Sequence, residues 1–401
     1  MSTTTVCGPA QDSGYRAVLG APHVARLMGG TLIGRLPTGM APIAILLLVR
    51  AEHGSLALAG LLGALYGLAC AVGQPLLGRQ VDRHGQTRIL VPAAIAASTA
   101  FLLLPCTGPT GHPVLAALAV LVAGLASPPL ESGLRALWPH LLPEPGRQRA
   151  ALALDSSTQG LVFIAGPLLA AGFAAGAGAY TAVVATAALG LLGSGLVVTA
   201  APSRTWAPPA GRRVHWSGPV RVPGLRVLFV ALIGTGVALG AVNVLALSAG
   251  ERHHAGWLSG AMPAALSVGS MLGGLVYGHR TWPGAPARHL VAASVGFAAG
   301  WLPLLSDPLP TVAVVLAALP GVFLAPLLTA AFVTVDRLAL KGESTEAFAW
   351  LIACIGLGQA AGTGLASLAS TTGPLLLAAV PFAGACAALA LLRRFTHHLS
   401  A

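Results

Sequence analysis

Charged residues are scarce in this chain. Asp, Glu, Lys and Arg make up 8% of its 401 residues, against about 25% in an average soluble domain. Apolar residues make up 55%, and the mean hydropathy is +0.81. So little charge cannot cover the surface of an ordinary soluble domain, which excludes that class and predicts a protein that lies within a lipid bilayer.

Lysine is nearly absent, since Lys341 is the only one. A phosphate-binding loop of the GxxxxGKS/T type needs a lysine after its second glycine, and the surroundings of Lys341, LALKGES, do not fit that pattern. Hydrolysis of ATP through this motif is therefore excluded.

Clusters of metal-binding residues are also missing from the sequence. The five cysteines are scattered without CxxC spacing, and the histidine pairs lie in a connection (His253, His254) and in the tail (His397, His398). No DxxxD pattern occurs. We expect no metal and no cofactor, and an intramembrane metal-dependent enzyme is disfavoured.

Long apolar runs make up most of the sequence. Twelve runs of about 18 to 25 residues lie between Arg26 and Leu392, each long enough to cross about 30 Å of hydrocarbon as a helix. The fourth run covers 113–137 and contains Pro128 and Pro129, which we expect to bend one continuous helix. The predicted fold class is an all-α integral membrane protein with twelve transmembrane helices.

The basic residues alternate with the apolar runs. The net charge is +11, but of the 22 Lys and Arg residues only Arg50 and Arg252 fall in odd-numbered connections, and Arg35 lies inside the first run. The others lie in the tails or the even-numbered connections, so the positive-inside rule predicts cytoplasmic termini and a location in the cell membrane. The positive charge thus indicates topology and contact with membrane lipids, and no nucleic-acid partner.

One connection, rich in Pro, Arg and Gly, is much longer than the others and divides the runs equally. The predicted organisation is a cytoplasmic tail (1–25), a six-helix half (26–200), a cytoplasmic linker (201–225), a second six-helix half (226–392) and a second tail (393–401). The halves align through shared glycines, namely Gly60 with Gly260, Gly73 with Gly273 and Gly78 with Gly278. Duplication of an ancestral six-helix unit is the simplest explanation of this alignment. The protein is expected to be a monomer.

The stretch GRQVDRHGQTR, between the second and third runs, concentrates charge in a short turn. It resembles the GxxxDRxGxxR signature of the major facilitator superfamily at Gly78, Asp82, Arg83, Gly85 and Arg88. Two six-helix halves around a linker resemble the plan of the same superfamily. The resemblance implies pseudo-symmetric halves and a conformational gate at these residues.

The same resemblance implies that Asp82 faces the start of the eleventh run, where GESTEAFAW offers Ser344 or Thr345 as an N-cap. A helix amino terminus stabilises a nearby anion by about 0.3 to 2 kcal/mol. Arg135, at the inner end of the fourth run, is a second candidate partner of Asp82 in the gate. The alternative is a turn that only sets topology, which explains its arginines but not Asp82.

Three charges lie at similar depth inside the predicted hydrocarbon region: Arg35, Glu131 and Asp155. Such charges are expensive and suggest function. We expect Arg35 to be paired and one acid to change protonation, and we favour Asp155 because Glu131 has Arg135 one turn away as a second cation. A static salt-bridge cluster is the alternative.

Polar residues elsewhere in the runs predict a proton and substrate cavity that includes Gln159, Asn243 and Gln359. Gly166 and Pro167, in the fifth run, resemble part of a motif of drug:proton antiporters in the superfamily, and they also suit close helix packing. Trp138 and Trp301 are expected to anchor the chain at the membrane interfaces.

Together these patterns predict a secondary transporter that uses protons to export a small organic molecule, and no enzyme. One proton moving down about 150 mV supplies roughly 3.5 kcal/mol. Two alternatives stay open: uptake of an anionic metabolite, with Arg35 unpaired and facing the cavity, and a membrane scaffold that transports nothing.

Overall fold

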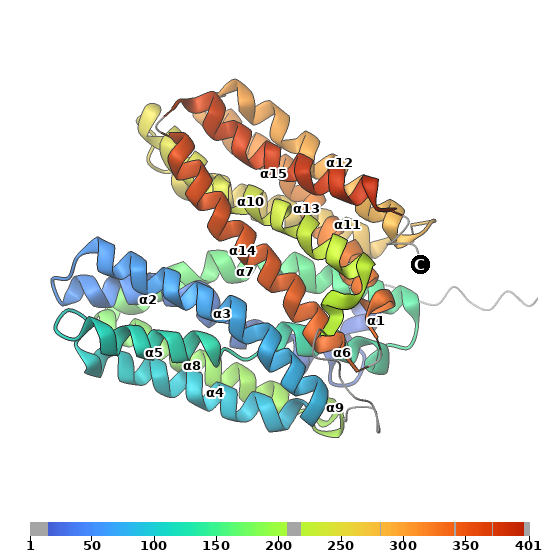
Figure 1. Ribbon diagram of the computed structural model, residues 1–401, viewed down its shortest axis with the longest axis horizontal. Coiled ribbons are helices and arrows are strands. Elements are labelled where there is room, and N and C mark those ends of the chain that lie inside the picture. Colours follow the sequence, from blue (N-terminus) through green and yellow to red (C-terminus); the bar gives the residue numbers. More distant parts are fainter. Residues whose placement is uncertain (1–14, 207–217, 281, 341, 371, 397–401) are drawn as a thin grey trace, which may run out of the picture.

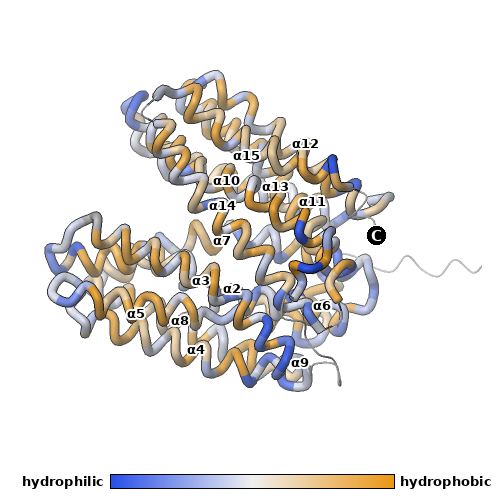
Figure 2. Tube along the Cα trace, viewed as in Figure 1, coloured by the Kyte–Doolittle hydropathy of each residue, from blue (hydrophilic) through white to orange (hydrophobic). Residues whose placement is uncertain are grey.

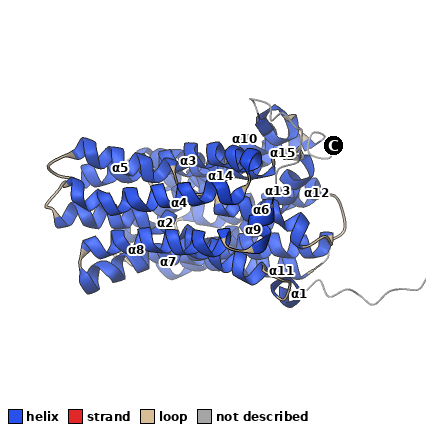
Figure 3. Ribbon diagram, turned by 90° about the horizontal axis from the view of Figure 1, so that it is seen from below, coloured by secondary structure: helices blue, strands red, loops and turns tan. Residues whose placement is uncertain are grey.

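The structure is a computed structural model that describes residues 15–206, 218–280, 282–340, 342–370 and 372–396. Every regular element in these ranges is a helix (Figure 3). Twelve of the helices are long and apolar enough to cross a membrane. The predicted fold class and number of spans are therefore confirmed.

The first group of helices runs from the amino terminus to the linker. Its elements are α1 (Tyr15–Leu19), α2 (Val24–Ala51), α3 (Leu56–His84), α4 (Gln86–Leu103), η1 (Leu104–Thr107), α5 (Pro113–Leu125), α6 (Leu130–Leu141), α7 (Pro145–Ala177), α8 (Ala179–Val198) and α9 (Ala201–Thr205). Proline at the first position of α5 and α7 suits a helix start, since the missing N–H would have no partner there.

The second group runs from the linker to the carboxyl terminus. Its elements are η2 (Gly218–Arg221), α10 (Pro223–Arg252), α11 (Leu258–His279), α12 (Pro286–Trp301), η3 (Leu302–Ser306), α13 (Pro310–Leu338), α14 (Ser344–Ser370) and α15 (Pro374–Arg394). Most of the predicted linker, residues 207–217, lies outside the described residues.

The two groups meet along α3, α6, α7, α11, α13 and α14. They lie against each other at the end of the bundle that holds α1 and the last turn of α15, which we call the termini end, and diverge toward the opposite, distal end (Figure 1). Hydrophilic residues gather mainly at these two ends, while the helices between them are largely apolar (Figure 2).

The fourth span is interrupted where the sequence predicts one bent helix over 113–137. Helix α5 ends at Leu125, and α6 begins at Leu130 after Pro128 and Pro129. Consecutive prolines remove backbone donors and clash with the preceding turn, so the helix stops here instead of bending. The interruption places Glu131 in the first turn of α6.

Glycines bring α2 very close to α7 and α8. A Cβ on Gly166 of α7 would lie 2.7 Å from the carbonyl carbon of Gly39, and a Cβ on Gly193 of α8 would overlap the backbone of Gly34. These close approaches require residues without a side chain. Gly166 is thus a packing residue, and Pro167 beside it lines the cavity between the halves.

Two tryptophans differ from the expectation. Trp138 and Trp301 are both buried inside the protein, with exposures of 1% and 0%, so neither is an interface anchor. Trp301 packs edge-to-face on Phe297. Position near the end of an apolar run did not distinguish a ring facing lipid from one packed against neighbouring helices.

We expect Gly193→Ala to destabilise the protein by about 1–3 kcal/mol, because the added methyl group forces α8 away from α2. Gly195→Ala is the matched control, since a Cβ on Gly195 meets nothing within 4 Å and alanine favours a helix. Thermal unfolding in detergent measures both variants. An equal effect of the two substitutions would contradict the close approach at Gly193.

Candidate functional site

Asp82, at the end of α3, joins the two groups of helices at the termini end. Its carboxylate accepts hydrogen bonds from the backbone N–H of Thr345 at 3.2 Å and of Glu346 at 2.8 Å. These donors belong to the first turn of α14, whose partly positive terminus stabilises the anion. The predicted contact between Asp82 and the start of the eleventh span is therefore present, through backbone donors.

The two glycines of the turn have separate roles. A Cβ on Gly78 would lie 3.1 Å from both the Cα of Glu346 and the carbonyl oxygen of Thr345, so glycine permits the close approach of α3 and α14. Gly85 has a φ of 93° between α3 and α4, a conformation that glycine adopts without strain.

A second pair across the halves was not predicted from the sequence. Arg79 binds the carboxylate of Glu346 through Nε at 3.0 Å and Nη2 at 2.7 Å, and Glu346 is 1% exposed. Arg221, just before α10, lies 3.2 Å from Glu343, which is also buried. The signal was in the sequence as two glutamates in a chain poor in acids, but it does not name their partners.

The remaining charges of the signature point away from this interface. Arg83 and Arg88 are exposed at the termini end, as expected for residues that meet lipid headgroups or water. Gln86, between them, is buried: its Nε2 donates to the carbonyl of Gly133 at 2.9 Å, and its Oε1 accepts from Ser203 at 3.0 Å. This residue ties α4 to α6 and α9.

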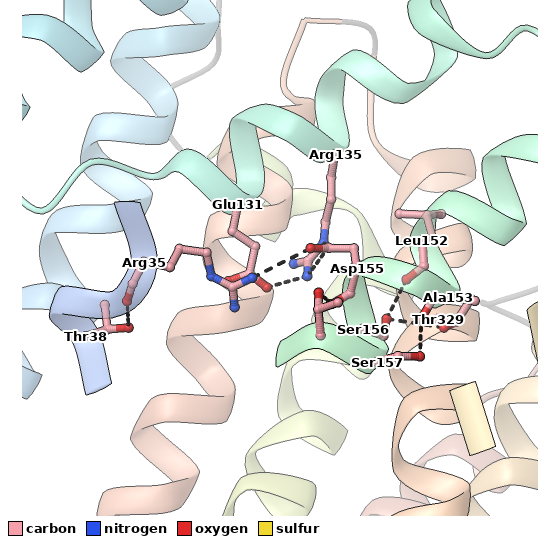
Figure 4. A network of polar contacts seen from close by, with 11 residues as sticks. Arg35, Thr38, Glu131, Arg135, Leu152, Ala153, Asp155, Ser156, Ser157 and Thr329 are labelled. Carbon is pink, nitrogen blue, oxygen red and sulfur yellow. Dashed lines mark hydrogen bonds and ion pairs between the residues drawn. The ribbon is translucent and has the colours of Figure 1, made fainter. Parts of the chain in front are cut away.

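The intramembrane charges come together in one cluster, which we call the charged cluster: Arg35, Glu131, Arg135 and Asp155 (Figure 4). Arg35 of α2 lies 2.7 Å from Glu131 of α6 and 3.6 Å from Asp155 of α7. All four residues are buried. The expected pairing of Arg35 is thus present.

Arg135 corrects two expectations. It is bound by Asp155, 2.7 Å from its Nε, and by Glu131, and so it is no partner of Asp82. Because it contacts both acids, it cannot distinguish Glu131 from Asp155, and that reason for favouring Asp155 as the proton carrier was wrong. The face of its guanidinium lies 3.5 Å from the centre of the Phe332 ring, on α13 of the other half.

The charged cluster is neutral when both acids are ionised, because two guanidinium groups face two carboxylates. Transferring a single charge from water into such a site costs several kcal/mol, and opposite charges with good geometry offset that cost. Protonation of either Glu131 or Asp155 would therefore leave a net positive charge beside Phe332.

A cavity of about 950 Å³ lies between the halves, on the distal side of the charged cluster. Its lining includes Arg35 and Glu131 but not Asp155, which is buried behind them. Of the two acids, Glu131 is therefore the one that meets the contents of the cavity. The expected lining residues Gln159, Asn243 and Gln359 are all present in its wall.

The cavity ends before the termini end is reached. Its lining from α3 covers Ala64 to Gln74 and stops short of Asp82, and its lining from α11 starts at Ser259, near the distal start of that helix, and stops at Ser270. The cavity thus extends toward the distal end.

Further contacts close the termini end. Ser156 of α7 accepts from Thr329 of α13 at 3.2 Å. Tyr15 of α1 donates to the carbonyl of Leu275 on α11 at 2.7 Å, and burial raises the pKa of Tyr15 to about 12, so this contact does not titrate near neutral pH. No group of His, Cys, Asp and Glu suited to a metal ion occurs in the part of the chain that the structure describes.

A bundle of twelve spans with a cavity between two halves is the architecture of a membrane carrier. Residues 27–285 match the Major Facilitator Superfamily, and the chain belongs to this family of transporters.

A relative of known sequence is the uncharacterized MFS-type transporter y4rN of Sinorhizobium fredii, 33% identical over 162 residues. The aligned part spans 39% of this chain and 39% of the relative's length.

Solved structures share the fold over nearly the whole chain. The human organic anion transporter TETRAN has a TM-score of 0.69 at 17% identity, covering 92% of this chain and 98% of its own. An outward-facing bacterial homologue of the iron transporter ferroportin has 0.70 at 15%, covering 93% and 98%. The fucose:proton symporter of E. coli has 0.70 at 12%, covering 92% and 97%. At these identities the likeness concerns the fold alone.

We expect Asp82→Asn to weaken closure of the termini end by about 1–2 kcal/mol, because a neutral amide binds the α14 terminus less strongly than a carboxylate. Substrate movement should be slowed or uncoupled at normal protein level. A cysteine at Ser157, buried in the closed interface, should then react faster with a maleimide.

Asp336→Asn is the matched control, since Asp336 lies near the termini end of α13 and is only partly buried. Unchanged labelling of the Ser157→Cys position in the Asp82→Asn protein would reduce the signature to a topology signal.

Proposed function

We propose that this chain is a proton-coupled secondary transporter that exports a small organic molecule across the cell membrane. The observation that carries the proposal is the position of Glu131. Its carboxylate lines the cavity and pairs with Arg135, which contacts the other half through Phe332. Glu131 is thus in contact with the cavity and, through Arg135, with the interface that closes the termini end.

In this proposal the termini end faces the cytoplasm. Arg16, Arg83, Arg88 and Arg204 are exposed there, as the positive-inside rule requires. Arg252, one of the two arginines expected on the other side, is paired with Asp307 at 2.8 Å. The described conformation, with its cavity extending distally, is then the outward-facing one, ready to release substrate and to take up a proton.

The charged cluster supplies the coupling. Protonation of Glu131 from the cavity leaves two guanidinium groups against one carboxylate, and the surplus charge lies in a buried interface next to Phe332. Opening of the termini end lets water hydrate Arg135, so a bound proton favours the inward-facing state. Release of the proton to the cytoplasm, as substrate binds there, restores a neutral cluster and the closed interface.

The alternative of anion uptake needs a free cation in the cavity. Arg35 is 2.7 Å from Glu131, which already neutralises it, so no observation favours that alternative. Export is supported by the partial resemblance of Gly166 and Pro167 to an antiporter motif. Among the solved structures of the same fold, one is a proton symporter and one an organic anion transporter, which supports coupled carriage of small molecules without fixing the direction.

We expect Glu131→Gln to remove the pH dependence of the conformational change, because glutamine imitates the protonated acid. In the wild type, lowering the pH should increase labelling of Ser157→Cys in the termini-end interface relative to labelling of a cysteine at the exposed Thr205, because a lower pH slows the maleimide reaction itself at both positions. In the Glu131→Gln protein, this relative labelling should be high and independent of pH, and substrate exchange should persist while proton-driven accumulation is lost.

Two further variants complete this experiment. Glu144→Gln, which removes a partly exposed acid paired with Arg147, should behave as the wild type. Asp155→Asn leaves the same surplus charge, so it should also raise labelling. Full pH dependence and full proton-driven transport in both cluster variants would leave a static salt-bridge cluster as the correct interpretation.

The orientation has its own test, in a variant whose five native cysteines are replaced by serine. A new cysteine at His112, exposed at the distal end, should react with a membrane-impermeant maleimide added to intact cells. A cysteine at Thr205, exposed at the termini end, should react only after the cells are opened. The reverse pattern would overturn the proposed orientation.

A further inference from the structure

The wall of the central cavity carries no free charge. Among the described residues, Arg35 and Glu131 are its only charged lining residues, and they are bound to each other at 2.7 Å. In the part of the wall that comes from α10, α11, α13 and α14 of the second half, no residue that the structure describes is charged. An ionic ligand would therefore lose its hydration in this cavity without meeting a counter-charge.

Side-chain amides take the place of charges in the wall. Four of them line the cavity, two from each half: Gln74 on α3, Gln159 on α7, Asn243 on α10 and Gln359 on α14. None of the four side chains has a hydrogen-bond partner among the described residues. Each amide offers both a donor and an acceptor to a ligand.

Gln159 gives the most specific indication. Its Oε1 atom is shielded from solvent and has no partner in the described part of the chain. A buried amide oxygen without a donor is costly, and a ligand hydroxyl or N–H group removes that cost. Gln159 lies four residues after Asp155 on α7, so it stands beside the charged cluster at the closed end of the cavity.

The rest of the wall is largely apolar, with scattered serine, threonine and tyrosine hydroxyls, and offers little to a cation. In the described part of the chain, Tyr66 and Phe163 are its only aromatic lining residues, which is few for the recognition of a cation through ring faces. Leucine, isoleucine, alanine and proline side chains form most of the remaining surface. A volume of about 950 Å³ suits a drug-sized molecule.

We propose that the transported substrate is an uncharged molecule with an apolar body and several hydroxyl or amide groups. These groups form hydrogen bonds with the side chains of Gln74, Gln159, Asn243 and Gln359. This inference rests on the proposed function, in which the cavity is the transport site. The four amides determine specificity by hydrogen bonding, and the paired Arg35 and Glu131 remain reserved for the proton.

The test uses three probes with one N-benzoyl body and different termini. N-(2-hydroxyethyl)benzamide is neutral, N-benzoylglycine is an anion and N-(2-aminoethyl)benzamide is a cation near neutral pH. Equilibrium binding of each labelled probe to the full chain in lipid nanodiscs measures affinity without any transport step. We expect the neutral probe to bind at least about tenfold more tightly than either ion, which corresponds to about 1.4 kcal/mol.

Substitutions then identify the amides. Gln159→Leu and Gln359→Leu should each weaken binding of the neutral probe about three- to tenfold, the loss expected for one or two hydrogen bonds. Gln80→Leu is the matched control, because Gln80 lies on α3 outside the cavity lining. Gln359→Glu adds an unpaired carboxylate to the second half of the wall and should shift preference to the cationic probe, a gain that a misfolded variant cannot imitate.

The outcomes separate this inference from the proposed function. Preference of the wild type for either charged probe, or no saturable binding of the neutral one, overturns the inference whatever the pH experiments give. Equal effects of Gln80→Leu and Gln159→Leu also overturn it. Binding of the neutral probe together with a pH-independent conformation leaves the inference standing and removes the proton coupling.

Discussion

Neutrality of buried charge is the constraint on which the rest of this structure depends. Arg35 and Arg135 are buried and face Glu131 and Asp155, so the four groups are tolerated only as a balanced set. The balance is kept by residues from three helices, α2, α6 and α7, and the prolines that end α5 allow α6 to begin at the correct depth. Removal of one negative charge would leave the other three groups unbalanced, and the proposed mechanism uses this imbalance to couple a single proton to movement of the helices.

The charged cluster and the turn at Asp82 belong to one continuous interface. Phe332, which covers the guanidinium of Arg135, packs edge-to-face on Phe348 with ring centres 6.2 Å apart. Phe348 lies two residues after Glu346, whose backbone N–H binds Asp82. Asp82 and Arg135 are therefore connected through Phe348 on α14 and Phe332 on α13. In the proposed mechanism, opening of the termini end separates Asp82 from α14 and Arg135 from Phe332. In the proposed mechanism, these contacts connect the turn at Asp82 with the acid that takes up the proton.

The same constraint shapes the cavity. Charge is confined to its closed end and is paired there, while the walls present amides and apolar side chains. In the proposed transport cycle this division keeps substrate binding apart from proton binding, since a charged substrate would disturb the neutrality of the charged cluster. Glu131 is the one residue that takes part in both regions, as a cavity lining and as a partner of Arg135.

Local properties of the sequence were enough for the membrane fold class, the twelve spans, the turn from Gly78 to Arg88 and the list of intramembrane charges, because hydropathy, motif spacing and composition do not depend on distant parts of the chain. The ion pairs between helices could not be predicted in this way. Arg135 binds Glu131 and Asp155 and not Asp82, and Arg79 meets Glu346 from the other half. Which acid faces the cavity, and which tryptophan is buried, depend on how each helix is rotated about its own axis. That rotation is set by packing against helices hundreds of residues away in the chain, so only the tertiary structure decided it.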